Sequence, residues 1–262
     1  MVEVRQLLLT IGVTSTSRVL ILRDRILGRI GRDRRVDGLY PGASRHAIQS
    51  GKNVLDAVLM MPDSGSVKAS LLICHGIGET VQHWIPVQQL LAANDVASLV
   101  FDYSGYGRSS GFFSANQSEM DAVSAFQHLK QLTAPLPVSV LGFSLGSGIA
   151  PAILSKVSVH RLLLCAAFTS LRKAAVSAGV PKSLAFAVPP IWDAEPTLRN
   201  SAIPLLVVQG DKDRLFPVQM AAELATFSGA RCEFVTVQGL SHNEPFYRPQ
   251  LSYWARIAAW LQ

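Results

Sequence analysis

The sequence predicts an α/β fold, in which helices cover both faces of a mostly parallel, eight-stranded sheet. From about residue 46 onward, short runs rich in Val, Ile and Leu alternate with stretches of helical period. Such alternation is typical of a parallel sheet with covering helices. A Gly-rich or polar loop follows each apolar run. Because open α/β sheets bind ligands at the carboxyl ends of their strands, these loops are where we expect a functional site.

Eight segments have the pattern of strands. The first two flank Gly51 and predict a hairpin, whereas the later ones are continuous apolar runs, as expected of strands buried on both faces. The predicted strands are residues 46–50, 53–61, 69–74, 96–101, 138–143, 161–165, 205–209 and 232–237.

Five segments have the pattern of helices. Ser118 is the predicted N-cap of the second, in which apolar residues recur at helical spacing. Pro151 is expected to bend or weaken the third, and Pro217 precedes the fourth at a position that suits its first turn. The predicted helices are residues 84–93, 117–132, 145–157, 218–227 and 246–261.

One stretch interrupts the alternation of strands and helices. Residues 171–200 contain four prolines and the apolar run 184–191. An insertion at this point lies over the carboxyl edge of the predicted sheet. We therefore expect a small cap that shapes a substrate pocket and helps to exclude water.

The first part of the chain has a different composition. Residues 1–44 form a predicted basic N-terminal extension, and residues 45–262 form the main domain. The formal net charge is +6, and seven arginines lie between Arg18 and Arg35. Apolar residues recur among them at helical spacing, which predicts a basic amphipathic helix at 18–30. This helix either packs on the domain as a solvated element or makes a peripheral contact with an anionic membrane.

Several classes of protein and partner are not expected. The arginines have no interleaved aromatic residues and no known nucleic-acid motif is present, so nucleic acid is not an expected partner. No apolar run is long enough for a transmembrane helix, and the short apolar run 7–13 lacks the features of a signal peptide. The spacing of Cys74, Cys165 and Cys232 fits neither a disulfide framework nor a zinc site. Reduced, buried thiols indicate a cytoplasmic setting.

The segment GFSLG at 142–146 fits the pattern G-x-S-x-G. The pattern alone also occurs in ordinary Gly-rich turns. Here it follows a predicted strand and precedes a helical stretch, which is the context of a serine on a sharp strand-to-helix turn, where bulky neighbours would clash. It therefore predicts Ser144 as a nucleophile.

A serine hydroxyl is a poor nucleophile at neutral pH and needs a base. Of the six histidines, only His242 lies in a loop after the last predicted strand and in the chain order serine, acid, histidine. Two aspartates follow strand 205–209. Asp213 is the predicted acid that orients the imidazole, and Asp211 is the predicted turn residue beside Gly210.

A tetrahedral intermediate also needs two backbone N–H donors. Leu145, the residue after the nucleophile, is expected to supply one of them, and Ile77 in the loop HGIG at 75–78 the other. In the same loop, His75 and Glu79 are expected to have structural roles, although Glu79 is also compatible with a place in the pocket.

Taken together, these motifs resemble those of the α/β-hydrolase superfamily. The matching segments are HGIGE at 75–79, FDYSGYGRS at 101–109, the serine turn, residues 210–217 and Ser241 with His242, in family order, within a match over about residues 46–262. The resemblance implies an α/β-hydrolase fold and a serine hydrolase with the triad Ser144, Asp213 and His242, which requires no metal and no cofactor. Residues 168–171 and the short cap are similar to the branch of small esterases, depalmitoylase-like enzymes and aminopeptidase-like hydrolases.

The first functional hypothesis is a hydrolase of a small-molecule carboxylic ester or thioester, of the carboxylesterase, thioesterase or lysophospholipase type. It proceeds through an acyl-enzyme on Ser144. The apolar cap suits an acyl chain, and Arg172, Lys173 and Lys182 tolerate an anionic head group.

Two alternatives belong to other classes. An aminopeptidase-like amide hydrolase needs carboxylates that bind an amine, and Asp193 and Glu195 are available in the cap. A non-catalytic binding module is the third hypothesis, since fold does not fix function. The complete set of serine, acid and histidine argues against it.

Overall fold

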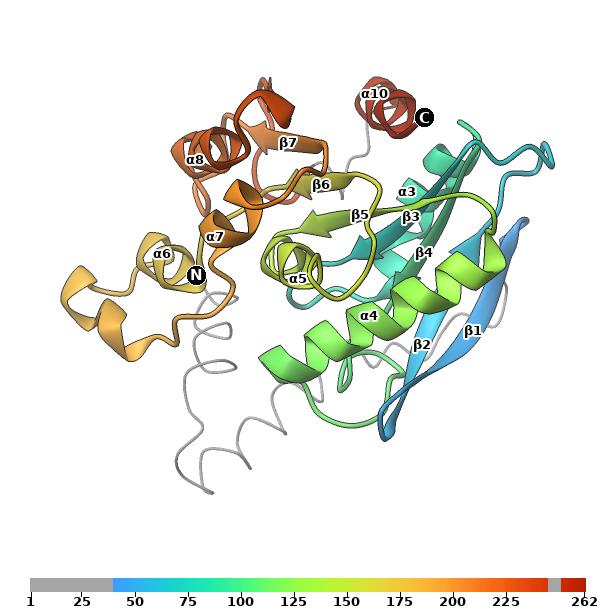
Figure 1. Cartoon of the computed structure of the whole chain (residues 1–262), viewed down its shortest axis with the longest axis horizontal. Coiled ribbons are helices and arrows are strands. Elements are labelled where there is room, and N and C mark those ends of the chain that lie inside the picture. Colours follow the sequence, from blue (N-terminus) through green and yellow to red (C-terminus); the bar gives the residue numbers. More distant parts are fainter. Residues whose placement is uncertain (1–39, 245–250) are drawn as a thin grey trace.

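The computed structural model describes residues 40–244 and 251–262. It confirms the predicted architecture, because eight strands form one mostly parallel sheet with helices on both faces (Figure 1). The strand order is β1-β2-β4-β3-β5-β6-β7-β8. The predicted basic helix at 18–30 and the first part of the predicted helix at 246–261 lie outside the described residues.

The predicted hairpin forms one edge of the sheet. β1 pairs antiparallel with β2 and begins three residues earlier than the pattern predicts, with Ala43 opposite Met60. β2 pairs antiparallel with β4, and all other neighbouring strands are parallel. The bounds are β1 Ala43–Ser50, β2 Asn53–Met60, β3 Ala69–Cys74, β4 Val96–Phe101, β5 Val138–Phe143, β6 Leu162–Cys165, β7 Leu205–Gly210 and β8 Cys232–Val237.

The helices divide between the two faces of the sheet. α4, α5 and α8 pack on one face, against strand residues such as Leu72, and α3 and α10 pack on the other, against residues such as Leu71. Neighbouring residues of a strand point to opposite faces, so a continuous apolar run supplies both cores. The bounds are α3 Val81–Ala92, α4 Ala115–Leu132, α5 Gly146–Ala152, α8 Val218–Ser228 and α10 Leu251–Leu261.

Several details of the helices differ from the predictions, and α3 begins at Val81 instead of residue 84. Ser114 caps α4, where its side chain accepts a hydrogen bond from the Gln117 N–H, whereas Ser118 is buried within the first turn of the helix. The helix predicted at 145–157 ends at Ala152. Pro151 supplies no N–H, and the chain then continues in tight turns, such as that from the Pro151 carbonyl to the Leu154 N–H.

The insertion between β6 and β7 consists of α6 (Leu171–Ser177), the 3-10 helix η1 (Lys182–Ala187) and α7 (Ala194–Arg199). Trp192 attaches it to the rest of the domain. This side chain is buried, packs close to Gly148 of α5, and donates from its indole N–H to Glu119 of α4 at 3.2 Å. The insertion therefore follows β6 and packs against α4 and α5 on one face of the sheet.

No helix in the described part of the chain is long and apolar enough to cross a membrane. All three cysteines lie in that part, and none forms a disulfide. Cys74 and Cys165 are buried, as predicted, whereas Cys232 at the exposed edge strand β8 is only half-buried.

Candidate active site

Ser144 stands on a strained turn between β5 and α5. Its φ is 51°, in the left-handed region that costs a residue with a side chain about 1–3 kcal/mol. The turn brings α5 directly against β3, because a Cβ at Gly146 would clash with the carbonyl oxygen of Cys74. The glycine of the motif is thus required by the close approach of two backbones.

The three residues predicted to act together are in contact. The Ser144 Oγ lies 2.9 Å from His242 Nε2, and His242 Nδ1 lies 2.7 Å from Asp213 Oδ2. Asp213 follows β7 and His242 lies in the loop after β8, so all three come from carboxyl ends of parallel strands. The rings of Phe143 and Phe216 flank the imidazole, with centroids 5.8 and 5.2 Å away.

The Asp213 carboxylate accepts four hydrogen bonds. Its Oδ1 accepts from the backbone N–H groups of Leu215 and Phe216, each at 2.8 Å. Its Oδ2 accepts from His242 and from the Gln209 side-chain amide at 2.7 Å. A carboxylate in this position holds the proton of the imidazole on Nδ1 and leaves Nε2 as the acceptor that faces Ser144.

The second aspartate of this loop has the predicted turn role. Asp211 is exposed and lies in the turn after β7. Its Oδ1 accepts from the Gly239 N–H at 2.6 Å. It therefore ties the loop that carries Asp213 to the loop that carries His242, without contact to the imidazole.

The backbone N–H groups of Leu145 and Ile77 donate no hydrogen bond to any group within residues 40–244 and 251–262. Leu145 is buried directly after Ser144. The loop of Ile77 is held by Glu79, whose Oε2 accepts from the Gly76 N–H at 2.7 Å and from the Trp84 indole at 2.9 Å. Glu79 is buried and braces the loop, in agreement with its expected structural role.

A buried polar pair lies under the same loop. His75 Nδ1 donates to the Gly76 carbonyl at 2.8 Å, and burial lowers the pKa of His75 to about 4. Its Nε2 has no hydrogen-bond partner among the described residues and lies 3.7 Å from the Asp102 carboxyl. Burial raises the pKa of Asp102 to about 7. His75 is therefore a neutral structural residue, as expected.

The predicted amine-binding carboxylates are engaged in local contacts. Asp193 caps α7 and accepts from the Glu195 N–H at 3.2 Å. Glu195 pairs with Arg199 at 2.9 Å in the same helix. Both contacts are within residues 193–199, and neither involves Ser144, Asp213 or His242.

Sequence reasoning missed two polar residues that support the turn and the acid. Gln209 is a buried amide near the end of apolar strand β7. Ser147 donates from its hydroxyl to the Ser144 carbonyl at 2.6 Å and accepts from the Phe168 N–H. The available signal was a polar side chain inside an otherwise apolar buried segment, which needs a hydrogen-bond partner.

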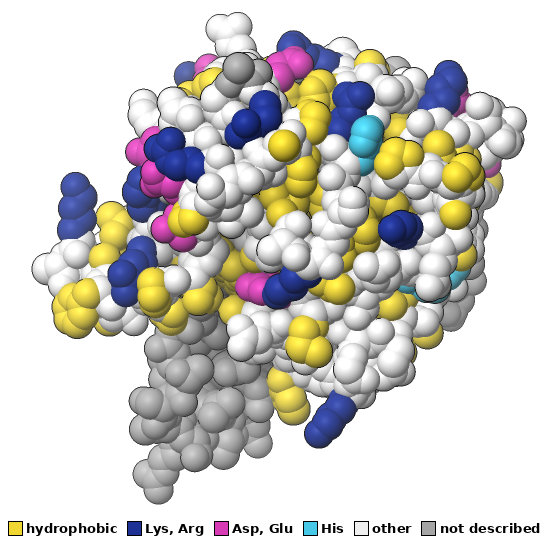
Figure 2. All heavy atoms as spheres, in the orientation of Figure 1, with side chains coloured by type: hydrophobic (Ala, Val, Ile, Leu, Met, Phe, Trp, Pro, Cys, Tyr) yellow, Lys and Arg dark blue, Asp and Glu magenta, His cyan; other side chains and the backbone are white. Residues whose placement is uncertain are grey.

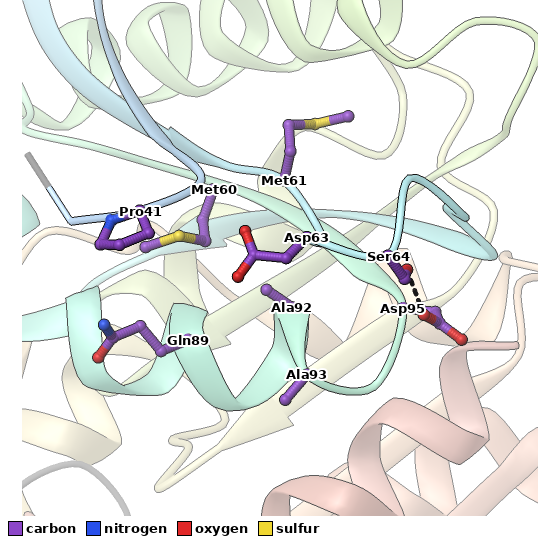
Figure 3. A pocket seen from close by; sticks show the side chains of 9 residues that line it. All are labelled: Pro41, Met60, Met61, Asp63, Ser64, Gln89, Ala92, Ala93 and Asp95. Carbon is purple, nitrogen blue, oxygen red and sulfur yellow. Dashed lines mark hydrogen bonds between the residues drawn. The ribbon is translucent and has the colours of Figure 1, made fainter.

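A cavity of about 310 Å³ lies elsewhere in the molecule. Figure 3 shows Asp63, Ser64 and Asp95 on its wall, with the Ser64 hydroxyl bonded to Asp95. Asp95 precedes β4, so this cavity is at the amino end of the parallel strands, opposite to Ser144. No three His, Cys, Asp or Glu side chains in the described part of the chain group to hold a metal ion.

Comparisons with known proteins find hydrolases among the proteins similar to this chain. A family model described as serine aminopeptidase, S33, matches residues 65–194. The lysophosphatidylserine lipase ABHD12 of Danio rerio is 24% identical over 213 residues, which cover 69% of this chain and 55% of that protein. Protein bem46 of Schizosaccharomyces pombe is 25% identical, over 74% of this chain and 68% of that protein. This chain thus spans about half the length of the lipase.

Solved structures show the same fold. An α/β hydrolase from Vibrio vulnificus superposes with a TM-score of 0.74 at 18% identity, and the match covers 94% of this chain and 95% of that one. The Pyrococcus furiosus esterase Pf2001 superposes with a TM-score of 0.68 at 19% identity, over 88% and 96% of the two chains.

The titration of the buried pair His75 and Asp102 determines how the unfolding free energy changes with pH. In the folded protein the pair holds one proton, on Asp102, between about pH 4 and 7. In the unfolded chain the pair also holds one proton, on His75, between the ordinary values of 3.8 and 6.5. The two states bind equal numbers of protons, so the pair adds little pH dependence in this window.

Asp102→Asn makes the numbers of protons bound by the folded and unfolded states unequal, because only His75 of the pair still titrates. The folded pKa of His75 is depressed, so its contribution to stability is complete above pH 6.5 and is lost as the pH falls toward 4. Between pH 7 and 4 we expect the variant to lose on the order of 3 kcal/mol more unfolding free energy than the wild type. Urea unfolding at both pH values measures this difference, in which the other titrating groups cancel. An equal loss in both proteins would contradict the assignment.

Proposed function

Because the chain belongs to the α/β-hydrolase superfamily, we propose that it is a serine hydrolase that cleaves a carboxylic ester or thioester through an acyl-enzyme on Ser144. The observation that carries the proposal is the continuous chain of hydrogen bonds from the Ser144 Oγ through His242 to Asp213, at 2.9 and 2.7 Å. A serine on a strand-to-helix turn with this pair of partners is the arrangement that acyl transfer requires.

Each group has one role in the proposed mechanism. His242 Nε2 takes the proton from the Ser144 Oγ as the oxygen attacks the acyl carbonyl, and Asp213 stabilises the imidazolium that forms. The N–H groups of Leu145 and Ile77 receive the oxyanion, and one such donor contributes about 3 kcal/mol to transition-state stabilisation. His242 then protonates the leaving group, and a water molecule that it activates releases the acyl group from Ser144.

The names of the relatives and the side chains of the insertion support the choice of an ester or thioester. One relative carries the name of a lysophosphatidylserine lipase and a structural neighbour that of an esterase. The insertion presents apolar side chains beside Arg172, Lys173 and Lys182, which suits an acyl substrate with an anionic group. No metal or organic cofactor enters these steps.

Amide hydrolysis of the aminopeptidase type is the second candidate, and the matching family model favours it. The same three residues can cleave an amide. The insertion gives it less support, because Asp193 and Glu195 are engaged within α7.

A fluorophosphonate probe tests the nucleophile. We expect the probe to label the folded wild type and to leave Ser144→Ala unlabelled, because it reacts only with an activated serine. Asp213→Asn should lower the turnover of p-nitrophenyl esters by about 10³–10⁴-fold, since the imidazole loses its orienting partner. Asp211→Asn is the matched control in the same loop and should retain most of the activity, because among the described residues the Asp211 side chain accepts only from the Gly239 N–H.

The same proteins decide between the two substrate classes when ester and aminoacyl p-nitroanilide panels are run side by side. Faster cleavage of the anilides would favour the aminopeptidase reading. Labelling that persists in Ser144→Ala, or no labelling of the folded wild type, would overturn the proposed function.

A further inference from the structure

The insertion carries an exposed apolar tip. In η1, all of whose residues the structure describes, no side chain is buried. Leu184 is 53% exposed and Phe186 is 75% exposed, the highest value of any large hydrophobic residue in the described part of the chain. Exposed apolar side chains that cluster on one element mark a surface that contacts something else.

Cationic side chains lie to one side of this tip. A groove of about 410 Å³ beside η1 is lined by Val176, Met220 and the side chains of Arg172, Lys173 and Lys182. Figure 2 shows hydrophobic and basic side chains together on the lobe formed by α6 and η1, at the left of the molecule. Long basic side chains lay their aliphatic stems on apolar surface while the charge stays in water.

The local charge is positive. Residues 171–192 contain Arg172, Lys173 and Lys182 and no Asp or Glu. Lys173 pairs with Glu223 of α8 at 2.6 Å. Arg172 donates to the backbone carbonyls of Val188 and Phe186, which are neutral acceptors, so its positive charge stays beside the apolar tip. Apolar side chains ringed by Lys and Arg suit the boundary between headgroups and acyl chains of an anionic bilayer.

We propose that this cap tip, formed by Lys182, Leu184 and Phe186, docks on an anionic phospholipid membrane. Leu184 and Phe186 enter the headgroup region, and Lys182 and Arg172 face the anionic headgroups. A protein partner fits less well, because a stable interface needs about 800 Å² on each side, whereas this surface is a narrow protrusion of one short 3-10 helix. The proposal does not depend on the catalytic assignment.

Vesicle sedimentation of the full chain tests the docking. Wild type should bind vesicles of phosphatidylcholine with phosphatidylserine more tightly than phosphatidylcholine alone, and high salt should weaken this binding. The double variant Leu184→Ser/Phe186→Ser should lose about tenfold or more in affinity, and Lys182→Gln about fivefold. Phe112→Ser is the matched control, because Phe112 is 67% exposed elsewhere on the surface.

Every variant retains the basic N-terminal segment, so its contribution cancels in the comparison. Unchanged melting temperatures establish that the variants are folded. Equal loss in Phe112→Ser, undiminished binding of the double variant, or no preference of the wild type for anionic vesicles would each overturn the proposal.

A second, independent observation concerns Gln209 of β7, which is 1% exposed. Its Nε2 donates to Asp213 Oδ2 and to the Phe216 carbonyl, both at 2.7 Å. Its Oε1 accepts from the Ala167 N–H at 3.1 Å. Two acceptors face the nitrogen and one donor faces the oxygen, so the hydrogen-bond network admits only one orientation of this amide.

We infer that Gln209 is a positioning residue for the proposed reaction, acting through Asp213. Its Nε2 donates to Asp213 Oδ2, the same oxygen that accepts the hydrogen bond from His242 Nδ1. Gln209 therefore competes with the imidazolium for the negative charge of this carboxylate. Without this donor, more of the carboxylate's charge is left to attract the imidazolium. The inference rests on the proposed function.

Gln209→Met removes the donor at similar volume. We expect the acidic limb of the kcat/KM profile for a soluble ester to move up by roughly one pH unit, and the plateau to fall about tenfold. Gln88→Met is the matched control. Gln88 is equally buried and donates to the Val58 and Ser98 carbonyls, so its loss lowers stability without moving the limb.

Should Gln209→Met not fold, Gln209→Asn keeps the amide on a shorter side chain and should move the limb in the same direction by less. An active wild type whose limb is unmoved in the folded variant would overturn this inference alone. An inactive, unlabelled wild type would instead overturn the proposed function.

Discussion

The close approach of α5 to β3 is the constraint on which the rest of the site depends. Ser144 can stand at the end of a central strand only because Gly146 leaves room for the carbonyl of Cys74, and the turn holds Ser144 at a φ of 51°. Parallel neighbours then bring the ends of β7 and β8 to the same edge. Asp213 and His242 reach Ser144 from there, although His242 is 98 residues away in sequence.

The carboxylate of Asp213 and the buried pair of His75 and Asp102 have different environments. Asp213 accepts four hydrogen bonds, two of them from backbone N–H groups, and these bonds compensate for the burial of its carboxyl group. Beneath the loop of Ile77, burial instead lowers the pKa of His75 and raises that of Asp102, so both favour their neutral forms.

Features that depend on local pattern were predictable from the sequence, and those that depend on packing were not. Four of the eight strands, β3, β4, β5 and β8, have the predicted bounds, and the first three are continuous runs that are buried between the helices of the two faces. The positions of Ser144, Asp213 and His242 followed from motif order. Gln209 escaped notice because its partners come from two loops, Asp213 and Phe216 from the loop after β7 and Ala167 from the loop after β6. The end of α5 was misjudged because Pro151 is compatible with more than one continuation of the chain.

The central claim is that Ser144 carries an acyl group during turnover. The most direct measurement is acid quenching during hydrolysis of a p-nitrophenyl ester, followed by the mass of the intact protein and of the peptide that contains Ser144. We expect one acyl group per chain, located on Ser144 and formed in a burst before steady hydrolysis. Steady hydrolysis without an adduct, or an adduct on another residue, would contradict it.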